Sequence, residues 1–275
     1  ALKCTSLDEA IGNVEMMKTF PGGAGDVFLV EEGLAGEEFS CYAISDGKSY
    51  RIFKSAQDNK TVFNFDEGDQ TGGMGAVCPA MVTEPIAAEI DEIISKVIKG
   101  MVIEGNKFVG VLFLGGIVDN GVIKIIEFNA RWGDPEVQAV LPCVKMDYVD
   151  IVEACLDGRL GDLEIAQDDK TRVCVVGASR GYPGDCSDIK GKRIYGLKEA
   201  GDMDGVGVFG AGVDVVDGKF YANGGRLFSV VAEGSDVLEA REKAYAGIAK
   251  INIEGNGLHY RTDIGWRDVE RFLKG

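Results

Sequence analysis

Basic residues are scarce in this sequence. Of its 275 residues, 29 are Lys or Arg and 45 are Asp or Glu, which gives a formal net charge of −16. Because nucleic-acid backbones are bound through clusters of Lys and Arg, this balance argues against a general nucleic-acid-binding protein. It leaves open the binding of a phosphorylated small molecule, since a few local cations and a metal ion can outweigh the overall charge.

Long hydrophobic runs and closely spaced cysteine pairs are also missing. The longest apolar run, from Val109 to Val118, is about half of what a membrane-spanning helix needs, so we expect no membrane partner. The seven cysteines include no Cys-x-x-Cys motif, which argues against a structural zinc site. We expect reduced core cysteines in a protein of the cytoplasm.

What the sequence does have is a globular composition rich in glycine. Hydrophobic residues make up 45% and charged residues 27%, which excludes an intrinsically disordered chain. At typical domain sizes of roughly 100–200 residues, the length predicts two domains. The 39 glycines indicate many tight turns and close approaches between backbone segments.

Hydrophobic periodicity and turn residues predict a mixture of helices and strands before residue 160. The capping-box pattern Ser6-Leu7-Asp8-Glu9 predicts a helix that ends near Lys18. The turn pairs Asp46-Gly47 and Asn120-Gly121 predict hairpins. The expected strands are 27–31, 38–44, 48–53, 108–118 and 122–128, and the expected helices are 84–103 and 146–156. The polar stretch 55–75 is too long for an idle connection, so we expect it to be functional or disordered.

The pattern of expected elements changes after a polar segment at 159–170. Short strands are expected at 172–178, 206–209, 212–216, 219–222 and 227–231, followed by a helix over 236–251. We therefore expect two domains with an α+β fold, spanning residues 1–160 and 171–275.

The most informative segment runs from Ile125 to Glu136. On a strand, Glu127, Asn129 and Arg131 would alternate onto one face. A carboxylate and an amide oxygen two residues apart are suitable ligands for Mg²⁺, and a nearby cation could contact the phosphates that the metal bridges. The alternative is an ordinary polar strand edge.

Two further segments carry weaker signals. Paired glycines in Thr71-Gly72-Gly73-Met74-Gly75 would let backbone N–H groups surround an anion, although the same residues could form a plain turn. The strand and acidic loop over residues 29–38 could hold an adenine on backbone groups and a ribose on a carboxylate, or could be only an acidic hairpin.

Together these segments resemble the phosphoribosylamine–glycine ligase family of the ATP-grasp superfamily. The family signature R-[LF]-G-D-P-E matches residues 131–136, with Trp132 in place of the usual Phe or Leu. The other matching motifs are E-F-N at 127–129, the glycine loop at 70–76, G-Y-P-G at 181–184, N-G-G-R at 223–226 and Y-R-x-D-I-G at 260–265. They follow one another in order over essentially the whole chain.

The resemblance implies ATP-dependent ligation of glycine to 5-phosphoribosylamine in purine biosynthesis. The implied cofactors are ATP and Mg²⁺ or Mn²⁺, and the implied ligands are these two substrates. The implied residues are Glu127 and Asn129 for the metal; Arg131, Asp58 and Lys60 for catalysis; Glu31, Glu32, Leu34, Glu37 and Glu38 for ATP; and Gly72, Gly73, Asp134 and Arg226 for substrate. We expect structural roles for His259 and for an Arg261–Asp263 pair.

Two departures from the family pattern affect these expectations. Asn59 and Thr61 stand where the family usually has His and Arg. Ala1 to Thr5 match the strand that follows the family's phosphate-binding glycine loop, so the resemblance implies a partial ATP-grasp domain, without the N-terminal domain and most of the first ATP-grasp subdomain, plus a small C-terminal α+β domain. We expect the missing part of the same protein to be a partner, and the isolated chain to bind ATP weakly. The remaining alternatives are another ATP-grasp carboxylate–amine ligase and a non-catalytic nucleotide-binding or partner module.

Overall fold

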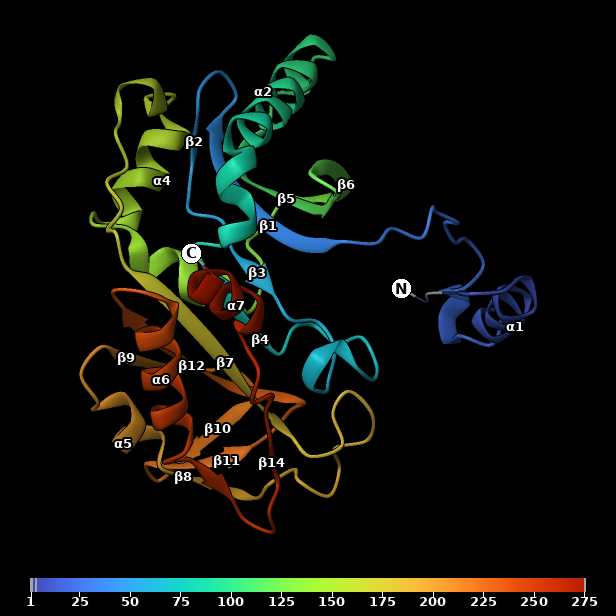
Figure 1. Cartoon of the computed structure of the whole chain (residues 1–275), viewed down its shortest axis with the longest axis vertical. Helices are drawn as coiled ribbons and strands as arrows, with labels where there is room; N and C mark the ends of the chain where they lie inside the picture. Colours follow the sequence, from blue (N-terminus) through green and yellow to red (C-terminus); the bar gives the residue numbers. More distant parts are fainter. Residues whose placement is uncertain (1, 3, 275) are drawn as a thin grey trace. The chain divides into compact units, whose positions relative to one another are not determined.

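The computed structural model describes residues 2 and 4–274 and separates into two compact units, 1–36 and 37–275. Figure 1 shows the course of the chain and the labels used below. No helix in the described part of the chain is both long enough and apolar enough to cross a membrane.

The first unit contains the predicted capped helix but not the predicted strand. Helix α1 (Leu7–Met17) begins after Ser6, whose Oγ accepts from the Glu9 N–H at 3.2 Å, while the Glu9 carboxylate accepts from the Thr5 N–H at 2.8 Å. The capping box is therefore confirmed. The expected strand at 27–31 is wrong: this segment has no regular structure, and Val27 is 88% exposed. An apolar run becomes a buried strand only where a neighbouring strand pairs with it, and no described strand does so here.

The second unit begins with an antiparallel sheet whose strand order is β2-β1-β5-β6. Alternation along β1 gives the sheet two different faces. Phe39 and Cys41 pack with helix α2, whereas Tyr42 and Ile44 pack in the cluster that contains residues of helix α4. The bounds are β1 Glu37–Asp46, β2 Tyr50–Ile52, β5 Val109–Asp119, β6 Val122–Asn129, α2 Ala87–Ile103 and α4 Tyr148–Leu156.

Both predicted hairpins in this sheet are confirmed. Gly47 has φ of 83° between β1 and β2, while Asn120 and Gly121 have φ of 50° and 79° between β5 and β6. Left-handed backbone at these positions turns the chain tightly without splaying the strands, and Gly and Asn tolerate it best.

A second sheet joins the two halves of the chain. Its order is β3-β4-β7-β12-β9, with β14 also paired to β7, so strands from before residue 80 share a sheet with strands after residue 170. Helix α6 packs against it through buried alanines. The bounds are β3 Gln57–Asp58, β4 Gly75–Cys78, β7 Thr171–Ser179, β9 Val206–Gly210, β12 Arg226–Gly234, β14 Leu258–His259 and α6 Val237–Ile248.

The remaining elements are short. A third sheet has the order β10-β11-β8-β13, with bounds β8 Arg193–Tyr195, β10 Val213–Val216, β11 Lys219–Ala222 and β13 Asn252–Ile253. The other helices are α3 Val137–Val140, α5 Leu197–Gly201 and α7 Trp266–Lys274. The 3-10 helices are η1 Pro21–Gly23, η2 Asn64–Asp66, η3 Met81–Ile86, η4 Leu141–Cys143 and η5 Leu160–Asp162.

Helix α6 offers a direct test of how the C-terminal half is stabilised. The Asp236 carboxylate accepts from the N–H groups of Leu238 and Glu239, both at 2.9 Å, and so caps the helix. We expect Asp236→Ala to lower the free energy of unfolding by about 1 kcal/mol, measured by urea denaturation. Asp236→Asn keeps the acceptor and should cost only a few tenths of that amount. Equal losses in both variants would contradict the capping role.

Candidate functional site

Strand β6 places the two predicted metal ligands on one face. Glu127 lies opposite Gly115 and Asn129 lies opposite Phe113 in an unbroken stretch of the β5–β6 ladder. Residues two apart in a regular strand point to the same side of the sheet. Glu127 is exposed and Asn129 is half-buried, so both are accessible to a ligand. The shared face is present, and the binding of a metal by these oxygen donors stays a prediction.

Arg131 does not continue this alternation. Strand β6 ends at Asn129, and the ring of Trp132 then packs 5.0 Å from both Tyr42 and Phe53, which draws the chain away from the edge of the sheet. Arg131 is exposed, and its Nη1 donates to the Trp132 carbonyl at 2.9 Å. The expectation of three alternating residues on one strand is therefore wrong, while a phosphate contact by Arg131 stays a prediction.

The loop Gly133-Asp134-Pro135-Glu136 is directed back onto the same face of the sheet. Glu136 is only 3% exposed, and its carboxylate accepts from the Ser40 hydroxyl at 3.0 Å. A Cβ at Gly133 would lie 2.4 Å from the Tyr42 hydroxyl, so no larger residue fits without movement. Ser40 and Tyr42 alternate on β1 and pair with Gly115 and Phe113, the residues opposite Glu127 and Asn129.

The paired glycines lie against this loop. Gly73 has φ of +117°, and a Cβ there would lie 2.4 Å from Pro135 Cδ and 2.8 Å from Asp58 Oδ1. Both the conformation and the close approach therefore require glycine. The Thr71 hydroxyl fixes the loop by accepting from the Gly73 N–H at 3.0 Å and donating to the Lys60 carbonyl at 2.7 Å.

Asp58 is a buried carboxyl group with an unused oxygen. It is 8% exposed, and its Oδ1 has no hydrogen-bond partner among the residues that the structure describes. Burial and the charge of Glu136 raise the pKa of Asp58 well above its ordinary value, although the Lys60 ammonium acts in the opposite direction. A buried acceptor without a donor is a suitable position for a donor on a ligand.

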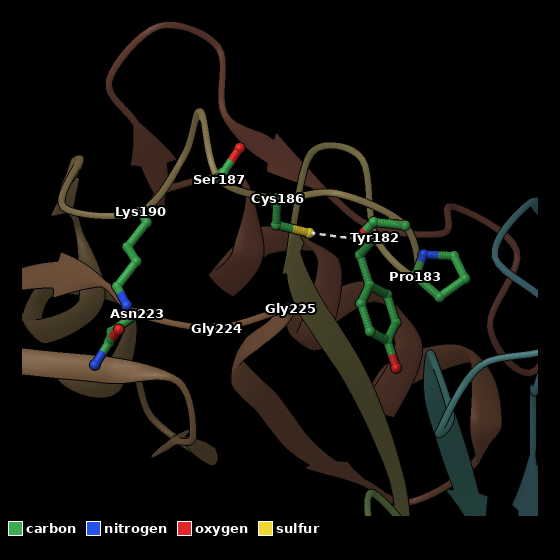
Figure 2. Close-up of a pocket in the computed structure, with 9 residues that line it drawn as sticks. Tyr182, Pro183, Cys186, Ser187, Lys190, Asn223, Gly224 and Gly225 are labelled. Atoms are coloured by element: carbon green, nitrogen blue, oxygen red, sulfur yellow. Dashed lines mark hydrogen bonds between the residues drawn. The ribbon is translucent and has the colours of Figure 1, made fainter. Parts of the chain in front are cut away.

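Arg226 and Tyr182 connect the C-terminal half to these loops. Arg226 Nη1 donates to the carbonyls of Gly72 at 2.9 Å and Asp134 at 2.7 Å, and it lies 3.1 Å from Asp134 Oδ1. The Gly72 N–H donates to the Tyr182 hydroxyl at 3.1 Å. Figure 2 shows the Tyr182 ring beside Gly225, where a Cβ would lie 2.4 Å from the ring, at one wall of a cavity of about 410 Å³. The G-Y-P-G and N-G-G-R motifs, which contain Tyr182 and Arg226, therefore contact the glycine loop and the Gly-Asp-Pro-Glu loop.

The predicted ATP contacts are divided between the two units. Glu31, Glu32 and Leu34 lie in the first unit, in a segment without regular secondary structure. In the second unit, Glu37 forms ion pairs with Arg271 and, at 3.8 Å, with Arg267. These ion pairs occupy the Glu37 carboxylate, so Glu38 is the more available of the two for a ribose. Glu38 also lies close enough to Asp58 for its negative charge to raise the pKa of Asp58. The adenine and ribose contacts stay predictions.

Two substituted family positions have structural partners. The Asn59 side chain donates to the Gly75 carbonyl at 3.3 Å, and the Thr61 hydroxyl accepts from Arg261 at 2.8 Å. His259 Nε2 lies 2.9 Å from the Val62 carbonyl, consistent with the expected structural role, and Arg261 and Asp263 form the expected pair with two hydrogen bonds.

The sequence interpretation omitted four residues that belong to this arrangement: Ser40, Tyr42, Glu136 and Tyr182. Glu136 and Tyr182 lie inside recognised motifs and could have been selected there. The alternation of Ser40 and Tyr42 along an apolar strand was the signal for the other two. Their relation to Glu127 depends on the strand order, which the local sequence does not reveal.

This fold and site define an ATP-grasp protein: the family model described as "Phosphoribosylglycinamide synthetase, ATP-grasp (A) domain" matches residues 3–137. The "Phosphoribosylglycinamide synthetase, C domain" model matches residues 172–267. Since the two models together match most of the chain, in order, the chain belongs to the phosphoribosylglycinamide synthetase family.

Curated relatives and solved structures agree with this assignment. The chain is 43% identical over 251 residues to a phosphoribosylamine–glycine ligase from Caldanaerobacter subterraneus, a match that covers 90% of this chain and 58% of that protein. It is 39% identical to a human trifunctional purine biosynthetic protein, covering 95% of this chain and 26% of that protein. The crystal structure of a Thermotoga maritima phosphoribosylamine–glycine ligase superposes with a TM-score of 0.81 at 32% identity, covering 96% of this chain and 65% of that one.

A more distant neighbour shows how widely the fold is shared. A biotin carboxylase domain from Hydrogenobacter thermophilus, solved with MgADP, superposes with a TM-score of 0.65 at 14% identity, covering 92% of this chain and 54% of that one. At this identity the likeness concerns the fold alone. The chain spans about 58% of the length of the Caldanaerobacter relative.

Proposed function

We propose that this chain, as part of a complete protein, catalyses the ATP-dependent ligation of glycine to 5-phosphoribosylamine, giving glycinamide ribonucleotide in cytoplasmic purine biosynthesis. The observation that carries the proposal is the convergence of four family motifs within one unit. Arg226 contacts both Gly72 and Asp134, and Gly73 packs against Pro135 and Asp58. The names of the relatives supply the reaction.

The reaction is a phosphoryl transfer followed by an acyl transfer. A glycine carboxylate oxygen attacks the γ-phosphorus of ATP. Glycyl phosphate forms, and ADP leaves. The amine of phosphoribosylamine then attacks the acyl carbon, a C–N bond forms, and phosphate and a proton leave. Such reactions depend mainly on positioning and on compensation of negative charge.

The described residues suit these needs. Lys60 and Arg131 are the cations assigned to the phosphates. Gly72 and Gly73 are assigned to the substrate, and an anion bound by their N–H groups would have to replace the hydroxyl groups of Tyr182 and Thr71 as acceptors. The unused Oδ1 of Asp58 is assigned to accept a hydrogen bond from an amino group of a substrate. Glu127 and Asn129 would hold Mg²⁺, which when bound supplies charge neutralisation at phosphate oxygens.

A chimera tests the proposal. In the Caldanaerobacter relative, the matched segment would be replaced by this chain, and ADP formation would be followed with ATP, glycine and phosphoribosylamine. We expect ADP formation to require both substrates and glycinamide ribonucleotide to appear in equal amount. ADP formation that ignores glycine and phosphoribosylamine, or that requires a different acid and amine, would overturn the proposal.

Arg226 gives a prediction about the phosphorylated substrate. Its Nη1 donates to Gly72 and Asp134, and within the described part of the chain its other guanidinium nitrogens have no hydrogen-bond acceptor, so they could bind an anion. In the chimera, we expect Arg226→Ala to raise the KM for phosphoribosylamine by about tenfold or more, since a charged hydrogen bond is worth roughly 1.5–3 kcal/mol. The KM for ATP should change much less. Equal changes in both constants would indicate a general loss of structure instead.

A further inference from the structure

Two buried cysteines lie side by side outside the proposed ligase site. Cys78 ends strand β4 and Cys143 ends the 3-10 helix η4, and both side chains are fully buried. Their sulfur atoms are 3.7 Å apart, close enough for a thiol hydrogen bond, and both are free thiols. Nothing in the proposed ligase reaction uses either sulfur.

The surroundings of this pair favour a thiolate on Cys143. Arg172 Nη1 donates to Cys143 Sγ at 3.1 Å, and the same guanidinium is held by Asp168. The hydrogen bond from Cys78 and the charges of Arg172 and Lys54 lower the pKa of Cys143 to about 7, although burial and the charge of Asp168 act in the opposite direction. Burial and the bond to Cys143 raise the pKa of Cys78, which therefore stays a thiol.

The same surroundings disfavour a metal ion at the two sulfurs. Arg172 and Lys54 are cations, and a metal cation between the thiols would be repelled by them. Within residues 2 and 4–274, no group of three or more His, Cys, Asp or Glu side chains is arranged to hold a metal. A nucleophilic thiolate with an adjacent protonated thiol is instead the arrangement of a redox-active dithiol.

We propose that Cys143 and Cys78 form a peroxide-sensitive dithiol, in which Cys143 is the attacking thiolate and Cys78 the resolving thiol. The Cys143 thiolate attacks one oxygen of hydrogen peroxide, the O–O bond breaks, and Cys143 sulfenic acid and hydroxide form. The Cys78 thiol then attacks the Cys143 sulfur and passes its proton to the departing hydroxide, so that water leaves as the S–S bond forms. Two thiols and one peroxide thus give one disulfide and two waters, with two electrons passing from sulfur to oxygen.

The second step brings the two sulfurs together. They must approach from 3.7 Å to about 2.05 Å for the S–S bond to form. The other buried cysteines provide an internal contrast. Cys41 and Cys174 are as buried as Cys143, so peroxide reaches any of the three only when the surrounding packing opens. Burial raises the pKa of Cys41 and of Cys174 to about 12, so only Cys143 is expected to react as a thiolate.

The test is peptide mapping of the full chain after brief treatment with hydrogen peroxide and alkylation of the remaining thiols. We expect a Cys78–Cys143 linked peptide, reversible by dithiothreitol, to form at least about tenfold faster than any oxidised product of Cys41 or Cys174. In Cys78→Ser, dimedone should trap a sulfenic acid on Cys143. In Cys143→Ser, Cys78 should stay reduced, and Cys41→Ser should leave the linkage unchanged.

Other outcomes would overturn the proposal. These are oxidation of Cys143 no faster than that of Cys41 and Cys174, the absence of the linked peptide in the unmodified chain, or equal oxidation of Cys78 with and without Cys143. The experiment needs neither ATP nor either substrate, so its result does not depend on the proposed ligase activity. Because the central measurement uses the unmodified chain, a variant that fails to fold does not remove the test.

Discussion

Replacing Glu127 by Gln in the chimera should reduce the rate of ADP formation about a hundredfold or more. Gln keeps the size of the side chain but loses the negative charge that would hold a divalent cation at the phosphates. Glu127 is exposed, so the free energy of unfolding should change by less than about 0.5 kcal/mol. A quenched assay of ADP measures the rate, and urea denaturation measures the free energy of unfolding.

Lys124 supplies the matched control for this experiment. It lies on the same strand and is also exposed, and nothing in the site depends on it. Lys124→Gln should leave both the rate and the stability close to those of the parent chimera. A Glu127→Gln variant as active as the parent would contradict the role of the β6 face in catalysis.

Removing the buried guanidinium of Arg261 should destabilise the second unit by about 3–5 kcal/mol. Arg261 is fully buried and forms two hydrogen bonds with Asp263, at 2.8 and 2.7 Å. Arg261→Met would leave the Asp263 carboxylate buried without its cation. The double variant Arg261→Met/Asp263→Asn should recover roughly 1–3 kcal/mol relative to Arg261→Met, because no unpaired charge remains. A double variant no more stable than the single one would contradict this explanation.

The same pair predicts a direction for the pH dependence. Burial alone would raise the pKa of Asp263, but the hydrogen bonds and charge of Arg261 and the N–H of Phe65 hold it below its ordinary value. A carboxylate with a lowered pKa in the folded state contributes stability above the pKa of the unfolded chain, and this is lost as pH falls. Denaturation curves should therefore show a loss below about pH 4 that is smaller in Asp263→Asn.

Local signals predicted most of the regular structure. The Ser6 capping box, the Asp46-Gly47 and Asn120-Gly121 turns and the apolar stripe of α2 each act within a few residues, and the structure contains the corresponding elements. Helix α7 was not predicted, although Trp266, Val269 and Leu273 recur at helical spacing and Val269 packs against the core. Its buried residue is Asp268, and it is attached through Arg267 and Arg271 to the distant Glu37 and Asp66.

The errors share a cause in long-range structure. The apolar run at 27–31 has the composition of a strand, but its hydrogen-bonding partner could not be inferred from its own residues. Arg131 has the spacing of a third strand residue, but the packing of Trp132 on Tyr42, ninety positions earlier in the chain, ends the strand first. The contact of Arg226 with Gly72 and Asp134 also depends on tertiary structure, which the residues around Arg226 do not reveal.

The most direct test of the account is the position of the metal. Crystals of the chimera grown with Mn²⁺ and a non-hydrolysable ATP analogue would locate the cation by its anomalous scattering. We expect a peak in the roughly 2.0–2.6 Å range of metal–oxygen bonds from both the Glu127 carboxylate and the Asn129 amide oxygen. A peak that contacts neither residue, in a complex with the nucleotide bound, would contradict the site proposed for this protein.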